Sequence, residues 1–431
     1  MSDKSKPAQV PKLRFPEFQQ AGEWTTEKLG SLVSISTEKV GNNNCVPMSI
    51  TSGVGLVSQE DKFGRVIAGD SYKNYLLLKP FDFAYNKSAT KEYPEGFLTL
   101  YNGVKLAAVP NSIFTCFRVN GTSPYPPYLK YLFAGNLHGQ WLRKFIQVGA
   151  RAHGSLSIND GDLLALPVPL PSGQSSLKEQ QKIADCLSSL DELIAAQARK
   201  VEALKTHKKG LMQQLFPREG ETQPRLRFPE FHGTTGWTMG KIENLAKRGS
   251  GHTPSKSVPE YYGGGVKWVS LADSKRLDTG FISETETNIS ELGIKNSSAV
   301  LHPAGTVLIS RDAGVGKSAV MAVPMAVSQH FIVWVCDNQK LRNWFLYYLL
   351  QFMKPIFERI ATGSTIKTIG LPFFKELSIA VPSVSEQQRI ADCLAFLDTL
   401  INTATQELET LKIHKKGLMQ QLFPSVEAIE A

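Results

Sequence analysis

The sequence has few cysteines and no long apolar run. Its 431 residues include five cysteines, an odd number without a CxxC pair, which favours reduced packing residues over a disulfide framework or a zinc site. No apolar stretch approaches the roughly 20 residues that a membrane helix needs. The first residues, MSDKSKPAQVPK, lack the apolar core of a signal peptide. We therefore expect a cytoplasmic protein without a metal site.

Intact catalytic motifs are also missing. The segment Gly314–Ser318 resembles the end of a P-loop, but Arg311 stands where the first glycine of that motif belongs. The segment Ser123–Tyr128 resembles the [N/D]PP[Y/F] loop of amino-methyltransferases without its Asn or Asp, and Glu60–Lys62 is an E-x-K without the preceding Pro-Asp of many nucleases. We interpret the three segments as a glycine-rich turn, the start of a helix and a solvated turn. The sequence therefore predicts no catalytic site.

The chain is basic and long enough for several domains. Its 48 Lys and Arg residues exceed its 39 Asp and Glu residues, which gives a net charge of +9 and a pI near 9.1. This excess favours a polyanionic partner such as nucleic acid, although an ordinary basic protein has the same composition. The length is compatible with about three domains or fewer.

Two long segments of the chain are nearly the same. The run from Glu179 to Pro217 recurs from Glu386 to Pro424, 207 residues later, and the hexapeptide LRFPEF occurs at Leu13 and again at Leu226. Solenoid repeats are only about 20 to 50 residues long. We therefore interpret the chain as two copies of one unit, each a whole domain followed by a helix.

The repeated segments have the spacing of a coiled coil, because their apolar residues alternate three and four positions apart. A lysine, Lys208 or Lys415, occupies the same position in both seams and should favour one register. About 36 residues at about 1.5 Å each would span about 54 Å, so two antiparallel helices would act as a ruler between the domains. The alternative is a lone amphipathic helix on each domain. The proposed seam residues are Ile183, Leu187, Leu190, Ile194, Leu204 and Leu211, followed by Ile390, Leu394, Leu397, Ile401, Leu411 and Leu418.

Between the repeated frames the two copies diverge. Runs such as Thr306–Ile309 and Phe331–Val335 predict strands, and a late helix is expected over Pro127–Gln147 and over Leu341–Ile360. We expect a mixed α/β (α+β) class: two β-rich domains separated by two long antiparallel coiled-coil helices, in a pseudo-two-fold repeat. The predicted boundaries are a tail at 1–10, a first domain at 11–171, a helix at 172–217, a second domain at 218–382, a helix at 383–424 and a tail at 425–431.

These elements together resemble a known family. The LRFPEF hexapeptide, a following Trp24 or Trp237, EQQ.IADCL and the helix end KKGLMQQLFP are similar to the specificity subunit of type I restriction-modification enzymes. The second domain adds Gly249–Ser255, Tyr261–Tyr262 and Val266–Val269, which resemble the SGxTPS…Y…I-x-W-V opening of that family's target-recognition domains.

The resemblance implies a non-catalytic subunit that binds double-stranded DNA. Each domain would read one half of a split target, and the helices would fix the gap and dock two modification (methyltransferase) subunits. Restriction (translocase and nuclease) subunits would join in the full complex. S-adenosylmethionine, ATP and Mg are expected on those partner subunits, and no cofactor is expected in this chain.

Candidate DNA contacts are polar and basic residues in clusters within the two domains. Lys and Arg would bind phosphates, while Arg, Lys, Asn and Gln at base edges would select sequence. Each could equally be a solvated surface residue. The candidates are Lys73, Asn74, Asn86, Lys87, Arg151 and His153 in the first domain, and Lys247, Arg248, Thr253, Ser255, Lys256, Arg311, Lys317 and Lys367 in the second.

Three other functions stay open at this point. The chain could be a related adaptor of another defence complex or of a lone methyltransferase. It could be an enzyme with its own methyltransferase or ATPase, which the missing motifs disfavour. It could also be a coiled-coil scaffold that does not bind DNA, in which case its basic charge would be incidental.

Overall fold

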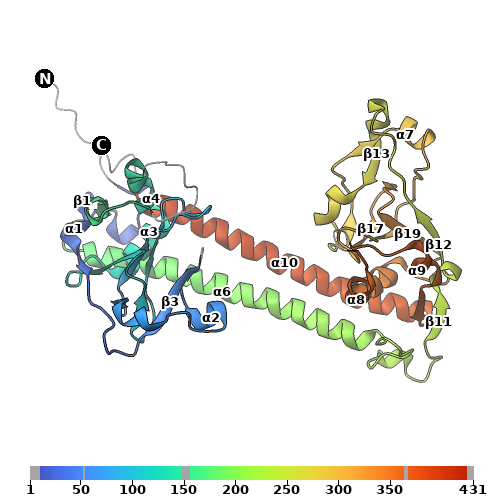
Figure 1. The fold of residues 1–431 in the computed structure, drawn as a ribbon, viewed down its shortest axis with the longest axis horizontal. Helices are drawn as coiled ribbons and strands as arrows, with labels where there is room; N and C mark the ends of the chain where they lie inside the picture. Colours follow the sequence, from blue (N-terminus) through green and yellow to red (C-terminus); the bar gives the residue numbers. More distant parts are fainter. Residues whose placement is uncertain (1–9, 52–53, 147–155, 364–366, 425–431) are drawn as a thin grey trace. The chain divides into compact units, whose positions relative to one another are not determined.

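The computed structural model describes residues 10–51, 54–146, 156–363 and 367–424. Contacts divide the chain into two compact units, one of Met1–Ala198 with Glu407–Ala431 and one of Arg199–Gln406. Each unit contains a β-rich domain and part of both long helices, α6 (Ser176–Leu215) and α10 (Val384–Leu422) (Figure 1). The boundaries predicted from the sequence divide the chain into consecutive segments. The two units are instead defined by contacts, and the first combines segments that are far apart in the sequence. The units therefore do not test the predicted boundaries.

The first unit contains two four-stranded sheets. Strand β9 (Phe114–Val119) alternates between two apolar clusters, because Phe117 and Val119 pack with the helices whereas Phe114 and Cys116 pack with residues of the second sheet. Burial on both faces explains why this strand is apolar almost throughout. The first sheet has the order β2 (Val33–Ser36), β9 (Phe114–Val119), β6 (Phe83–Asn86), β7 (Phe97–Leu100), and the second has the order β4 (Gly55–Ser58), β3 (Val46–Thr51), β8 (Ala107–Val109), β5 (Leu76–Leu78).

The late helix of the first unit is shorter than predicted. It ends at Ala134, and a second helix starts at Leu137, because Asn136 between them has a left-handed backbone with a φ of 63°. The predicted turn at Glu60–Lys62 is also wrong, since these residues lie in a helix capped by the Ser58 hydroxyl. The α-helices before α6 are α1 (Leu29–Leu32), α2 (Gln59–Phe63), α3 (Pro126–Ala134), α4 (Leu137–Leu142) and α5 (Asp160–Leu164).

The second unit has different sheets around a similar plan. Both predicted strands are confirmed as β16 (Val307–Ser310) and β19 (Phe331–Cys336), and the predicted helix is confirmed as α8 (Asn343–Ile360). Gly314 and Gly316, with φ values of 114° and 83°, form the glycine-rich turn between β16 and β17. One sheet has the order β12 (Ala246–Ser250), β19 (Phe331–Cys336), β16 (Val307–Ser310), β17 (Ser318–Met321), β14 (Phe281–Ile282), the other has the order β15 (Asn288–Ile289), β13 (Tyr262–Val269), β18 (Ala326–Val327), and the α-helices are α7 (Glu291–Lys295), α8 (Asn343–Ile360) and α9 (Leu371–Glu376).

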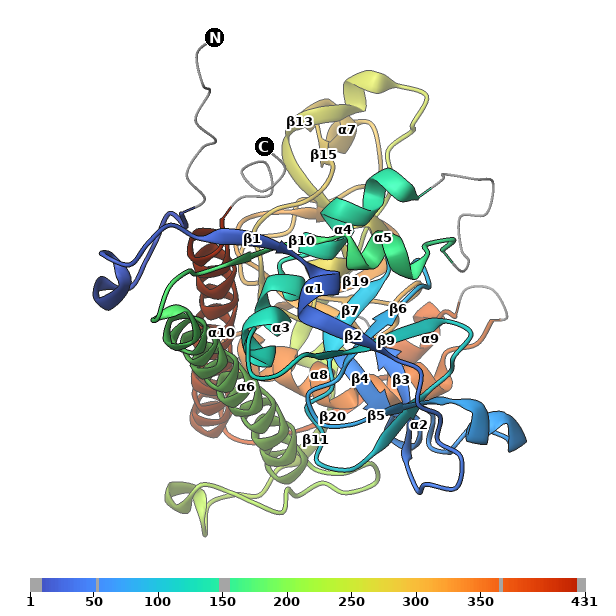
Figure 2. The ribbon, with the colours of Figure 1, turned by 90° about the vertical axis from the view of Figure 1, so that its left-hand side faces the viewer.

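A two-stranded ribbon closes each domain where the chain enters and leaves it. In the first domain β1 (Thr25–Lys28) pairs antiparallel with β10 (Pro167–Leu170), and the two strands lie side by side in Figure 2. In the second domain β11 (Thr238–Lys241) pairs in the same way with β20 (Ser378–Val381). The first residue of one strand therefore faces the last residue of the other in both domains. Short 3-10 helices are η1 (Pro16–Phe18), η2 (Asp70–Asn74), η3 (Arg143–Phe145), η4 (Pro229–Phe231), η5 (Ile242–Asn244), η6 (Pro259–Tyr261) and η7 (Leu271–Lys275).

Each domain core contains the start of one long helix and the end of the other. The first core holds Ile183 and Leu187 from α6 together with Leu422 and Phe423 from the end of α10. The second core holds Ile390 and Leu394 from α10 together with Met212 and Leu215 from the end of α6.

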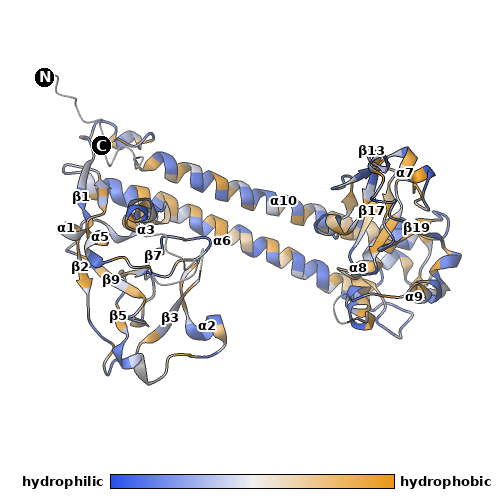
Figure 3. Ribbon diagram, turned by 45° about the horizontal axis from the view of Figure 1, so that its top comes forward, coloured by the Kyte–Doolittle hydropathy of each residue, from blue (hydrophilic) through white to orange (hydrophobic). Residues whose placement is uncertain are grey.

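Within the first unit the helix segments run antiparallel, since Asp191 contacts Lys415 while Gln197 contacts Glu407. Hydrophilic and hydrophobic residues alternate along both helices (Figure 3). The predicted fold class, two mixed β-rich domains with antiparallel helices in an internal repeat, is confirmed.

Candidate nucleic-acid interface

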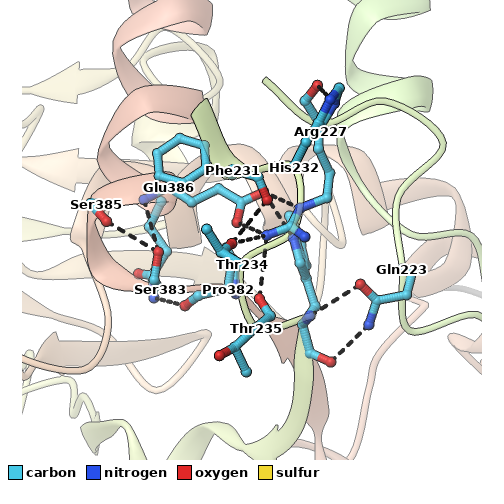
Figure 4. Close-up of polar contacts among 12 residues, drawn as sticks. Gln223, Arg227, Phe231, His232, Thr234, Thr235, Pro382, Ser383, Ser385 and Glu386 are labelled. Carbon is cyan, nitrogen blue, oxygen red and sulfur yellow. Dashed lines mark hydrogen bonds and ion pairs between the residues drawn. The ribbon is translucent and has the colours of Figure 1, made fainter. Parts of the chain in front are cut away.

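A buried cluster joins the start of α10 to the segment that precedes the second domain. Arg227 donates to Glu386 from Nε at 2.9 Å and from Nη2 at 2.6 Å, and the Trp237 indole donates to the same carboxylate at 3.1 Å (Figure 4). The Glu386 side chain is 1% exposed, so these charge-assisted bonds compensate its charge. Ser383 caps the helix, because it lies directly before α10 and its hydroxyl accepts from the Glu386 amide at 3.3 Å.

The same cluster occurs at the start of α6. Arg14 donates to Glu179 from Nε and Nη2, both at 2.7 Å, and the Trp24 indole donates at 3.3 Å. The Arg of LRFPEF, the following Trp and the Glu of EQQ therefore form one structural unit in both copies. Their repetition in the sequence follows from this shared role in folding.

A second cluster pairs the two long helices in the first unit. Asp191 of α6 accepts a hydrogen bond from the Tyr131 hydroxyl at 2.8 Å and contacts the Lys415 ammonium of α10. Burial, together with the neighbouring carboxylate, raises the pKa of the Tyr131 phenol, which therefore stays a hydrogen-bond donor.

The second unit repeats this arrangement. Asp398 of α10 accepts from the Tyr348 hydroxyl at 2.8 Å and from Lys208 of α6 at 2.5 Å, and burial raises the pKa of that phenol as well. Each seam lysine thus has an acidic partner on the other helix, so its polarity is satisfied in one pairing of the helices.

A groove beside each lysine cluster has the same helix wall in both units. Its volume is about 730 Å³ in the first unit and about 480 Å³ in the second. The helices line both grooves with identical residue types at positions 207 residues apart, whereas the remaining wall comes from the domain and differs between the two units. The shared lining includes Lys205 and Lys412, Lys209 and Lys416, and Met212 and Met419.

The predicted DNA contacts of the first domain do not gather at one place. Asn86 is buried, and its side-chain oxygen accepts from the Ser88 amide at 2.8 Å, so it shapes the backbone after β6. Lys87 is half-buried and forms an ion pair with Asp160 at 3.1 Å.

Two other first-domain candidates, Lys73 and Asn74, are exposed on η2. The last two, Arg151 and His153, lie outside the described residues.

The structure brings several second-domain candidates together around a cavity of about 680 Å³. Thr253 and Lys256 line it together with Gln329, His330 and the buried Trp268. The Thr253 hydroxyl donates to the Gln329 side-chain oxygen at 2.5 Å. Ser255 is exposed on the same loop.

Lys317 and Lys367 line a second cavity of about 490 Å³, together with Lys354 and Glu358. The Lys317 ammonium also donates to the Ser274 carbonyl at 2.8 Å. This cavity therefore collects basic side chains from three separate segments of the second domain.

The remaining second-domain candidates lie apart. Lys247 is exposed on β12, and its neighbour Arg248 is half-buried and paired with Glu243 at 2.5 Å. Arg311 donates from Nε to the Ile369 carbonyl at 3.1 Å, so this edge of its guanidinium holds the backbone.

The seam residues differ in burial along each helix. Those near the helix starts lie in the domain cores, because the domains cover these turns. The buried ones are Ile183, Leu187, Ile390, Leu394 and Leu397. The half-buried ones are Leu190, Ile194, Leu204, Leu211, Ile401, Leu411 and Leu418.

Comparison with known proteins shows which family the chain resembles. Residues 234–412 match the family described as "Type I restriction modification DNA specificity domain". The type I restriction enzyme MjaIX specificity subunit of Methanocaldococcus jannaschii is 32% identical over 193 residues, which are 44% of this chain and 44% of that protein. The putative MjaX specificity subunit of the same organism is 26% identical over 333 residues, which are 76% of this chain and 74% of that protein. The chain is therefore similar to type I restriction enzyme specificity subunits.

Solved structures of this family have the same fold. An S subunit of a type I restriction-modification system from M. genitalium is 16% identical with a TM-score of 0.56, covering 96% of this chain and 99% of that one. A chain from a type I R-M system is also 16% identical, with a TM-score of 0.60 and coverage of 93% and 98%. Among the described residues, none of the helices combines the length and the apolar character that a membrane span needs.

Sequence reasoning missed several residues of the duplicated frame. Asp191 and Asp398 were not selected, although both follow a leucine at repeat-equivalent positions. The signal that could have found them is identity between the two copies at polar positions next to the apolar seam. Ser328, which lines the same cavity as Thr253, lies in the divergent part of the second domain, so the repeat does not point to it.

Proposed function

We propose that this specificity subunit binds double-stranded DNA and reads a bipartite target, one half-site with each domain. It catalyses no reaction itself. Two modification subunits dock on its helices, and they and the restriction subunits carry S-adenosylmethionine, ATP and Mg. The complex would work in the cytoplasm, where the DNA lies.

One observation carries the proposal: the duplicated frame surrounds interiors that differ. The Arg–Glu–Trp cluster recurs with the same bonds at both helix starts. The sheets it positions have different strand orders in the two domains. This combination is what two readers of unlike half-sites on a common frame would require.

The twin grooves support two equivalent partner sites. Lys209 and Lys416 on their rims form no ion pair with any residue that the structure describes, and Met212 and Met419 supply apolar lining. A protein segment with acidic and apolar side chains suits such a groove better than a DNA backbone, which offers phosphates alone.

Exchange of one domain tests the proposal. The ribbons define the boundaries, since residues 238–381 enter and leave the second domain as paired strands, as do residues 25–170 in the first. Replacing residues 238–381 with those of another specificity subunit should change one half of the methylated sequence in cells that express the complete system. The matched exchange of residues 25–170 should change only the other half. Methylome sequencing reads both, and a change of both halves after a single exchange would refute independent reading.

A further inference from the structure

The cavity of about 680 Å³ in the second domain is assembled from two segments held face to face. The loop after β12 runs along the turn between β18 and β19, where the His252 amide donates to the Val327 carbonyl at 3.0 Å. A Cβ on Gly251 would lie 1.8 Å from that same carbonyl oxygen, so only glycine allows this approach.

Two aromatic residues fix the position of this loop through hydrogen bonds to its backbone. The Trp268 indole donates to the His252 carbonyl at 3.1 Å, and the Tyr262 hydroxyl donates to the Pro254 carbonyl at 2.6 Å. The rings meet edge to face, with centroids 6.2 Å apart. The backbone around the cavity is therefore fixed before any ligand arrives, which lowers the entropy cost of binding.

One polar group of this cavity lacks a partner. Ser328 is 1% exposed, lines the cavity, and its hydroxyl makes no hydrogen bond with any residue that the structure describes. An unpaired buried hydroxyl destabilises the fold, and a ligand that pairs with it recovers the lost energy. The hydroxyl therefore indicates a polar ligand in this cavity.

The rest of the lining suits a nucleobase beside a phosphate. Gln329 is exposed, and its oxygen accepts from Thr253 while its amide nitrogen makes no bond to any described residue. Amide side chains recognise adenine through paired hydrogen bonds. Lys256, exposed at the rim, forms no ion pair within the described part of the chain and can meet a phosphate.

We propose that this cavity reads the base edge of one nucleotide in the second domain's half-site. Gln329 and Ser328 select the base, Thr253 orients the Gln329 amide, and Lys256 binds the adjoining phosphate. The inference rests on the proposed function and assigns it to named residues.

The test compares substitutions of each kind in the complete complex. Gln329→Ala and Ser328→Ala should relax the preference at one position of one half-site by about 5- to 150-fold, a range that follows from about 1–3 kcal/mol for a good base contact. Lys256→Ala should weaken binding to all sequences alike and reduce its salt dependence by about one phosphate contact. Gln339→Ala, an exposed glutamine of the same domain away from the cavity, is the control.

Binding is measured with fluorescent duplexes that carry each base at every position of the target, at several salt concentrations. A preference in the Gln329 and Ser328 variants identical to wild type overturns the inference and leaves the proposed function standing. A wild-type complex without any sequence preference refutes the proposed function itself. Relaxed preference spread over both half-sites would also overturn the inference, because one cavity in one domain cannot produce it.

Discussion

The Arg227–Glu386–Trp237 cluster makes a sharp prediction for Glu386→Ala. The variant leaves the Arg227 guanidinium and the buried Trp237 indole without their shared acceptor. Removing one partner of a buried ion pair costs about 3–5 kcal/mol. Arg227 keeps contacts with Thr234 and Thr235, so we expect a loss at the lower end, about 3 kcal/mol, in the second domain.

Hydrogen exchange is the suitable assay, because a chain with two cores need not unfold in one step. A loss of about 3 kcal/mol corresponds to about 100-fold faster exchange of the slowest amides in β16 and β19. Amides of β6 and β9 in the first domain serve as the internal reference. The control is Glu230→Ala, which breaks the ion pair of Glu230 with Arg389. Both side chains of this pair are about half exposed, so the exchange rates should stay unchanged. Equal effects of Glu386→Ala and Glu230→Ala would refute the reasoning.

Three further predictions follow from separate features. Seven residues inserted after both Ala198 and Gln406, so that the helical pattern continues, lengthen each helix by about 10.5 Å. The gap between the half-sites should then widen by about three base pairs. An unchanged gap in methylome sequencing would contradict the hypothesis that the helices set this distance. Gly251→Ala places its methyl group against the Val327 carbonyl and should destabilise the second domain by about 2–3 kcal/mol in urea unfolding, whereas Gly265→Ala, which meets nothing within 4 Å, should not. Burial lowers the pKa of His138 from 6.5 to about 4, so the folded first domain holds this imidazole neutral while the unfolded chain protonates it below pH 6.5. The free energy of unfolding should therefore be unaffected by His138 above pH 6.5 and fall by about 3 kcal/mol as the pH falls to 4. His138→Phe should remove that part of the pH dependence of stability.

Much of the fold could be predicted because it depends on periodic patterns. The 207-residue repeat and the spacing of Ile183, Leu187 and their equivalents indicate two units and two long helices. The break at Asn136 could not be predicted from the pattern of apolar residues, since a single left-handed residue leaves no periodic signal.

The candidate site was predictable only where chemistry and sequence proximity coincide. Thr253 and Lys256 were selected from one short loop, and they do line one cavity. Ser328 was missed because its importance comes from burial without a partner, a property of three-dimensional packing. Asn86 was selected for its amide, yet the fold turns that amide inward to the backbone of Ser88.

Each core contains the start of one long helix and the end of the other, and this arrangement has a consequence for folding during synthesis on the ribosome. The first core includes Leu422 and Phe423, and the Phe423 ring lies 5.4 Å from that of Tyr128. The first domain therefore emerges early but cannot complete its packing until the last turn of α10 has been translated. The second core has all of its residues by the time Leu394 emerges. The domain made second is thus able to finish folding first, and the nascent chain must keep an incomplete first core from aggregating in the interval.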